Sequence, residues 1–281
     1  MKITLWGPRA SGKTTYITMV YGTTILSTSK WIVRPEDALS SRFVIEHIDT
    51  ILNGNFPSAT LPSSEPTYYT YSFSLRDEST SRHKPISFNW GETIANILKL
   101  DGQQQTSSGN SDNNQVVVSF ADVAGELYEE ESLTSQLWDH LADSDGILCL
   151  LDPNENGADY FRMVFSLMQN LFLKQKELAG GLVNGRIPHY IAFCFSKIDH
   201  PDFHPLTNQH EKIIEFLATQ TGINLDNLLS PYVLPERLEY FTISSLGTSA
   251  EIVDGQILAP QSISPINILQ PLSWFFQNME G

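Results

Sequence analysis

Residues 2–14 read KITLWGPRASGKT, and this stretch decides the fold. From Gly7 to Thr14 it matches G-x-x-x-x-G-K-[ST], the pattern of a loop that binds phosphate groups. The residues before Gly7 are apolar enough for a buried strand, and residues 15–21 can continue as a helix. A strand, a glycine-rich loop and a helix are the context that this pattern requires. The sequence therefore predicts a site for a nucleoside triphosphate.

The residue types in this loop match the chemistry of phosphate. Consecutive backbone N–H groups can surround the phosphate oxygens, and the N-terminus of the following helix adds partial positive charge. Lys13 would neutralise the β- and γ-phosphates, and the Thr14 hydroxyl would be a ligand of Mg²⁺. The loop residues expected to contact the nucleotide are Arg9, Ala10, Ser11, Gly12, Lys13, Thr14 and Thr15.

Beyond residue 116, strands and helices alternate regularly along the chain. Near-continuous apolar runs such as residues 146–151 (GILCLL) and 190–195 (YIAFCF) are typical of strands that are buried on both faces. The pattern predicts a P-loop NTPase fold of three layers, α/β/α, around a mainly parallel sheet of about six strands. The expected strands are 2–6, 68–75, 116–120, 146–151, 190–195 and 240–243, and the expected helices are 35–51, 127–141, 160–178, 209–221 and 266–276, the last with Pro271 as a potential kink.

The whole chain, residues 1–281, is expected to form one domain with two insertions. The first insertion, residues 23–67, is rich in Ser, Thr and Pro, and it would form the first switch region. The second insertion covers residues 76–114. Its expected parts are a sheet-edge segment at 86–88, a short helix at 92–100 and, by composition, a mobile loop at 101–114 (DGQQQTSSGNSDNN).

Composition limits the classes of partner. The net charge of −15, from 17 basic and 32 acidic residues, argues against nucleic acid or an anionic membrane as the main partner. A glycine-rich loop can still bind a small polyanion against this distant field. Cys149 and Cys194 lie inside apolar runs, so we expect small core residues rather than a disulfide or a metal pair. No signal peptide and no transmembrane run is recognisable, and we expect a protein of the reducing cytoplasm.

Residues 120–126, FADVAGE, end the third apolar strand. An aspartate at the carboxyl end of such a strand faces the phosphate crevice of a doubly wound sheet. There Asp122 can hold Mg²⁺ through water, and the backbone N–H of Gly125 can approach the γ-phosphate. The alternative is a strand-ending aspartate that caps the next helix.

Residues 195–199, FSKID, end a later strand. Here the chain resembles the small GTPases of the Ras-like, translation-factor superfamily, whose base-binding motif [N/T/S]-K-x-D follows the corresponding strand. The resemblance implies that Asp199 accepts hydrogen bonds from guanine and that the stem of Lys197 packs on the purine. A carboxylate only accepts hydrogen bonds, so it matches the two donors of guanine and repels the acceptor edge of adenine. GTP and GDP are therefore the expected ligands.

A further motif and one departure belong to the same resemblance. Ser244, Ser245 and Leu246 stand where the family's S-A-[K/L] motif supports the base from its backbone. Ser196 replaces the commonest Asn, so a hydrogen bond that bridges to the phosphate loop is expected to be lost. The resemblance covers most of the chain except the two insertions. The long first insertion and the closing residues 267–274 are most similar to the bacterial double-GTPase group.

The family also needs a threonine in its first switch, whose hydroxyl binds Mg²⁺ and whose backbone senses the γ-phosphate. Thr60 and Thr67 are the candidates. Thr60 is favoured, because the switch threonine usually lies several residues before its strand. The resemblance thus implies a metal site made by Thr14, Asp122 and Thr60.

Two residues bear on hydrolysis. Glu126 stands where Ras-like enzymes place a Gln that orients the attacking water, and it either takes that role or merely begins an acidic helix. Arg9 occupies a loop position where several relatives have glycine. It either reaches the γ-phosphate as an arginine finger, or it points to solvent or pairs with an acid. The candidate catalytic residues are Lys13, Glu126 and Arg9, and slow intrinsic hydrolysis is expected.

Together these motifs predict a GTP-binding molecular switch that hydrolyses GTP slowly with Mg²⁺ and works with a protein effector or activating partner. One alternative is a pseudo-GTPase that holds nucleotide without turnover, which the absence of the usual Gln favours. The other is a P-loop ATPase with Asp122 as its acidic residue, which Lys197 and Asp199 oppose.

Overall fold

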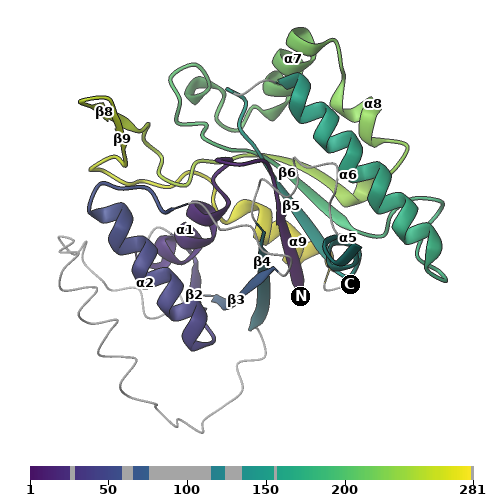
Figure 1. Cartoon of the computed structure of the whole chain (residues 1–281), viewed down its shortest axis with the longest axis horizontal. Coiled ribbons are helices and arrows are strands. Elements are labelled where there is room, and N and C mark those ends of the chain that lie inside the picture. The colour runs from purple at the N-terminus through teal and green to yellow at the C-terminus, as the bar shows by residue number, and fades with distance from the viewer. Residues whose placement is uncertain (26–28, 59–65, 76–114, 124–134, 155–156, 280–281) are drawn as a thin grey trace, which may run out of the picture.

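A mixed seven-stranded β-sheet runs through the centre of the molecule, with helices on both of its faces (Figure 1). The computed structural model describes all residues except 26–28, 59–65, 76–114, 124–134, 155–156 and 280–281. In chain order the elements are β1 (Lys2–Trp6), α1 (Lys13–Ile25), β2 (Trp31–Pro35), α2 (Ala38–Leu52), β3 (Thr67–Leu75), β4 (Val116–Asp122), α5 (Ser135–Ala142), β5 (Gly146–Leu151), α6 (Gly157–Glu177), β6 (Tyr190–Phe195), α7 (His210–Thr221), α8 (Leu225–Leu229), β7 (Leu238–Thr242), β8 (Glu251–Val253), β9 (Gln256–Leu258) and α9 (Gln270–Met279).

The strand order in the sheet is β2-β3-β4-β1-β5-β6-β7. From β4 to β7 every neighbouring pair is parallel, whereas β2 and β3 join the sheet in antiparallel pairs. In the middle of β1, Thr4 is paired with Ala121 of β4 on one side and with Ile147 of β5 on the other. Because β1, β5, β6 and β7 run in the same direction, the carboxyl ends of β1, β6 and β7 lie at one edge of the sheet.

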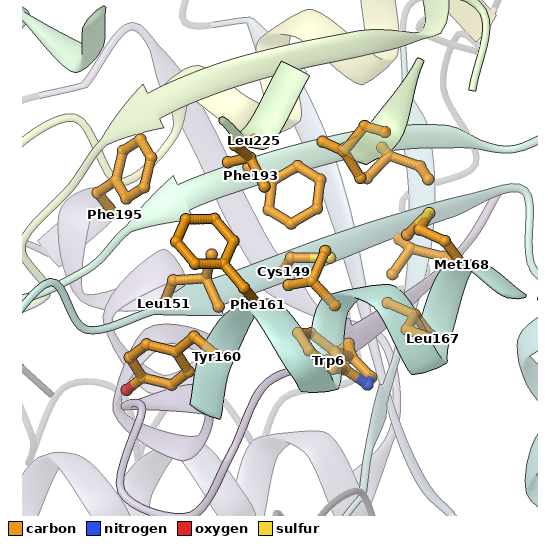
Figure 2. Close-up of a cluster of buried hydrophobic side chains, with 14 of the residues drawn as sticks. Trp6, Cys149, Leu151, Tyr160, Phe161, Leu167, Met168, Phe193, Phe195 and Leu225 are labelled. Carbon is orange, nitrogen blue, oxygen red and sulfur yellow. The ribbon is translucent and has the colours of Figure 1, made fainter. Parts of the chain in front are cut away.

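Alternate residues of the strands enter two separate cores, because successive side chains of a strand point to opposite faces. On β5, Cys149 and Leu151 belong to the core beneath α5, α6, α7 and α8, where Phe193 and Trp6 also lie (Figure 2). Leu148 and Leu150 belong to the other core, which α1, α2 and α9 cover. All six residues of the strand GILCLL are therefore buried, and both of its faces are covered by a core.

The predicted fold class is confirmed, with one strand more than expected. The extra strand is β2, which pairs antiparallel with β3 at the edge of the sheet, with Val33 opposite Phe73. The sequence analysis predicts no strand in the first insertion, and that prediction is wrong. An edge strand is paired on one side only, so a short run that ends in Pro35 suffices. The hairpin of β8 and β9 was also not predicted.

The last helix begins later than expected, at Gln270 instead of Ile266. Ile266 instead forms an isolated antiparallel bridge with Ser244. Pro271 thus falls in the first turn, where its missing N–H has no helical partner to lose, so it need not kink the helix. The expected segments 86–88 and 92–100 and the loop 101–114 lie outside the described residues, as do residues 127–134, the first half of the helix predicted at 127–141.

Both cysteines are buried free thiols, as predicted. Burial raises the pKa of each thiol well above its usual value, which keeps both neutral and unreactive. None of the described helices combines the length and the apolarity that crossing a lipid bilayer would require.

We expect a buried histidine to make stability depend on pH. Burial lowers the pKa of His189 from 6.5 to about 4, against a hydrogen bond to the Ala142 carbonyl that raises it. The unfolded chain therefore takes up the proton first as the pH falls through 6.5, and stability is lost between pH 6.5 and 4, by on the order of 3 kcal/mol. Urea unfolding of the wild type and of His189→Gln at pH 7 and pH 5 measures this. The variant should lose clearly less stability over that range, and parallel losses would contradict the assignment.

Candidate functional site

A pocket of about 420 Å³ opens where the carboxyl ends of β1, β6 and β7 meet. We call it the central pocket. Its walls come from the loop between β1 and α1, the segments after β6 and β7, the segment after α2, and the β8–β9 hairpin. The lining residues are Arg9, Ala10, Ser11, Gly12, Lys13, Thr14, Thr15, Phe56, Pro57, Ser58, Ser196, Lys197, Asp199, Ser244, Ser245, Leu246, Thr248, Ala250 and Ile257.

The phosphate loop passes so close to the sheet that its first position excludes a side chain. A Cβ on Gly7 would lie 2.6 Å from the Leu150 carbonyl oxygen and 2.7 Å from Ser11 Oγ. Gly12 has a φ of +93°, a backbone conformation that residues with a Cβ rarely adopt. Both glycines of the motif therefore have a local reason: one for close approach and one for its turn.

Lys13 lies beneath this loop rather than in solvent, with 7% of its surface exposed. Its Nζ donates hydrogen bonds to the carbonyl oxygens of Gly7 at 2.7 Å and Pro8 at 2.8 Å. The ammonium is thus held against the inner wall of the loop at a fixed place. A held charge loses little entropy when an anion binds to it, which suits a phosphate ligand.

The segment after β6 is hydrogen-bonded to the phosphate loop. Ser196 Oγ donates to the carbonyl oxygen of Ser11 at 3.1 Å, and the Ser196 N–H donates to the Leu151 carbonyl at 2.7 Å. Our expectation that serine at this position would lose the bridge was therefore wrong. The backbone comes close enough for the shorter side chain to reach.

Lys197 is held by a carboxylate that the sequence analysis did not single out. Its Nζ lies 2.7 Å from Oδ2 of Asp152, the residue that follows β5, and Asp152 is buried. The other carboxylate oxygen of Asp152 accepts from the N–H and the side-chain amide of Asn154. With a φ of 55°, Lys197 is in the left-handed region, which directs its side chain differently from those of the strand before it. The ion pair fixes the end of that side chain while its stem lines the pocket.

Asp199 is oriented by the segment after β7. Ser244 donates a hydrogen bond from its hydroxyl to Asp199 Oδ1, and Ser244 Oγ in turn accepts from the Gly247 N–H at 2.7 Å. The Ser249 hydroxyl donates to the backbone carbonyl of Asp199 at 2.7 Å. Ser245 and Leu246 line the same wall. The segments after β6 and β7, which are far apart in sequence, thus meet at Asp199.

The donor set for a divalent cation is partly visible. Asp122, the last residue of β4, is 2% exposed, and Thr14 lines the central pocket. Thr67, the first residue of β3, is paired with Asp122 across the antiparallel ladder. Carboxylate and hydroxyl oxygens are the hard donors that Mg²⁺ prefers, usually with several waters and phosphate oxygens. Among the described residues there is no group of three or more His, Cys, Asp or Glu that could hold a metal by itself.

Most of the predicted site residues meet in one place, and three lie outside the described part of the chain. The phosphate loop, the base-binding motif and the closing motif all line the central pocket. Thr60, Gly125 and Glu126 fall in stretches that are not described. The prediction missed Asp152, Phe56 and Ile257. For Asp152 a signal existed, because an aspartate that directly follows a buried strand is the feature that singled out Asp122.

A second hollow lies elsewhere on the molecule, between β2, β7 and α9. It has a larger volume, about 620 Å³, and Lys30, Trp31, Glu239 and Trp274 are among the residues that line it. None of the motif residues in the described part of the chain lines it. The chemistry therefore points to the central pocket, although that pocket is the smaller one.

Comparison with protein-family models and with curated proteins finds no match. Solved structures show similarity to the chain at low identity. The signal recognition particle receptor SRb-GTP/SRX complex from Chaetomium thermophilum is 12% identical over 89% of this chain and 95% of that chain, with a TM-score of 0.45. A GTP-binding protein from Sulfolobus solfataricus in complex with GDP is 12% identical over 99% and 52%, with a TM-score of 0.38. The bacterial selenocysteine-specific elongation factor EF-Sec is 11% identical over 100% and 28%, with a TM-score of 0.38.

This chain spans about half the length of the archaeal GTP-binding protein, and likewise 50% of SsGBP in its GDP complex. All of these TM-scores lie below 0.5, so the likenesses carry no argument about this chain. The assignment of the site depends on the geometry of the central pocket.

The bridge from Ser196 can be tested by its removal. Ser196→Ala leaves a buried carbonyl of Ser11 without this donor, and the free energy of unfolding should fall by about 1–2 kcal/mol. Ser196→Asn keeps a donor at this position and should recover part of the loss. Ser245→Ala is the matched control, since the Ser245 side chain makes no hydrogen bond within the described part of the chain. Equal losses in Ser196→Ala and Ser245→Ala would show that the bridge contributes nothing.

Proposed function

We propose that the chain is a GTP-binding molecular switch that hydrolyses GTP slowly with Mg²⁺. The observation that supports this most is the composition of the central pocket. A phosphate loop and an aspartate–lysine pair line the same cavity. A nucleotide has phosphates at one end and a base at the other, so it would use both.

The selectivity for guanine would come from Asp199. A carboxylate can accept two hydrogen bonds and donate none, which matches the N1–H and the exocyclic amine of guanine. The hydrogen bond from Ser244 holds one oxygen of this carboxylate in place. The Lys197 stem, whose ammonium is held by Asp152, would then cover one face of the purine. Orientation by neighbours reduces the entropy that binding would otherwise cost.

The phosphates would be bound by the loop amides and by Lys13, whose ammonium is already held by Gly7 and Pro8. Thr14 and Asp122 would hold Mg²⁺, together with Thr60 or Thr67 from the first switch. When bound, that ion supplies positive charge at the phosphate oxygens. Arg9 lines the pocket within the phosphate loop and adds a further cation there.

A binding module without turnover is the second candidate. It is favoured by Glu126 at the position where the related enzymes have a glutamine, because a carboxylate repels the γ-phosphate. In such a protein the nucleotide would act as a clamp between the phosphate loop and the segments after β6 and β7. An ATPase is the third candidate, and Asp199 in the pocket wall argues against it.

The base assignment is tested by Asp199→Asn. Replacing one acceptor by a donor mismatches guanine, so GTP affinity should fall by about 2–4 kcal/mol while xanthosine triphosphate gains relative affinity. Competition binding of GTP, xanthosine triphosphate and ATP to the purified variants measures this. Asp202→Asn is the matched control, because Asp202 lies in the same loop with its side chain 80% exposed. Unchanged GTP affinity in Asp199→Asn would refute the guanine assignment.

Hydrolysis is tested by phosphate release in a single turnover. We expect the wild type to release phosphate slowly and Lys13→Ala to release none. Phosphate release in the Lys13→Ala preparation would therefore reveal a contaminating phosphatase. If Glu126 orients water, Glu126→Ala slows release at constant GTP affinity, and if it crowds the γ-phosphate the rate stays or rises. Arg9→Ala should cost ~10³-fold in rate if Arg9 acts as a finger. Tight GTP binding without release by the wild type would decide for the binding module.

A further inference from the structure

Along the chain, a small β-hairpin follows the Ser244-Ser245-Leu246 motif and precedes α9. It lies outside the central sheet (Figure 1). It consists of β8 and β9, with Ile252 opposite Ile257 and Val253 opposite Gln256. Asp254 and Gly255 form its two-residue turn, with φ values of 51° and 78°. Left-handed backbone at both turn positions matches the right-handed twist of the strands, so this hairpin is a well-defined unit.

The base of the hairpin is attached to the base-binding side of the central pocket. The Ser249 hydroxyl donates to the Asp199 carbonyl, and the Gly247 N–H donates to Ser244 Oγ, each at 2.7 Å. A Cβ on Gly247 would lie 1.7 Å from the carbonyl oxygen of Ser264, where the chain returns from the hairpin. The two ends of the segment are therefore closely packed beside Asp199.

A second attachment joins the hairpin to the segment after α2. The Ala259 N–H donates to the Gly54 carbonyl at 2.9 Å. Ala259 also belongs to a small buried cluster with Met19 of α1, Ile51 of α2 and Leu246 of the closing motif. The hairpin and the segment after α2 thus meet on the Leu246 side of the pocket, which is the side of Asp199.

Both segments present apolar side chains to the pocket where solvent reaches them. Ile257 is 66% exposed and Phe56 is 37% exposed, yet both line the cavity. Leu246, which is buried, lines it too. A purine is flat and largely apolar on its faces, and covering these side chains with it would remove apolar surface from water.

We propose that the β8–β9 hairpin clamps the base of the nucleotide, with Ile257 and Phe56 as its contact residues, and that it thereby slows nucleotide dissociation. The proposal rests on the proposed function, because its ligand is the guanine nucleotide. Lys197 covers the base from the segment after β6, and the hairpin adds a wall from a separate segment. Ile257 and Phe56 are positioning residues, since they hold the base and do not touch the reacting phosphates.

The test compares the dissociation rate of a fluorescent GDP from the wild type, Ile257→Ala, Phe56→Ala and Val253→Ala. Val253 is the matched control. Ile257 is paired with Ile252, and Val253 follows Ile252, so its side chain lies on the other face of the hairpin from Ile257. Val253 does not line the pocket. Loss of an apolar contact should raise the dissociation rate about five- to twenty-fold in Ile257→Ala and Phe56→Ala. Val253→Ala should dissociate at the wild-type rate. Both test residues are exposed, so the variants should keep the fold.

Inorganic tripolyphosphate separates the base from the phosphates. It can occupy the phosphate loop but has no base, so its inhibition constant should be the same in the wild type and in Ile257→Ala. A wild-type dissociation rate in Ile257→Ala would overturn the clamp and leave GTP binding standing, and so would an equal increase in Val253→Ala. A weaker inhibition constant for tripolyphosphate in Ile257→Ala would overturn it as well. A wild type that binds no guanine nucleotide would instead overturn the proposed function, and the clamp with it.

Discussion

The close approach of the phosphate loop to the sheet is the constraint on which the rest of the site depends. Gly7 lies so near the end of β5 that a Cβ would meet the Leu150 carbonyl oxygen at 2.6 Å. This contact places the loop amides directly over the carboxyl edge of the sheet, where the segments after β6 and β7 also arrive. A side chain at Gly7 would push the loop away from that edge, and the cavity between the motifs would lose one wall.

Around this loop the site is held by side chains that act on one another rather than on a ligand. Ser196 joins the segment after β6 to Ser11, Ser244 orients Asp199, and Asp152 holds Lys197. Asp152 is buried, so removing its partner would leave a charge away from water, which is costly. Such contacts keep polar groups satisfied by the protein itself and leave little to reorganise when a ligand enters.

The fold also shows why an acidic protein can be expected to bind an anion. The net charge of −15 acts over the whole surface, whereas Lys13, Arg9 and the amides of the loop act within the pocket. The electric field of these fixed groups acts at short range, so inside the pocket it outweighs the distant and screened surface charge. The nearby carboxylates are engaged as well, since Asp152 pairs with Lys197, and Asp199 of the pocket wall accepts from Ser244.

The sequence by itself determined the layers of the fold and most of the pocket wall. Apolar strands such as GILCLL and loop residues such as Gly7 and Lys13 have local physical requirements, and these can be recognised along the chain. The tertiary structure alone decided that β2 joins the sheet, that Ser196 reaches Ser11, and that Asp152 faces Lys197. It also brought Phe56 and Ile257 to one cavity. These contacts join segments that are distant in sequence, and the spacing of residues along a chain does not tell how far apart such segments lie in space.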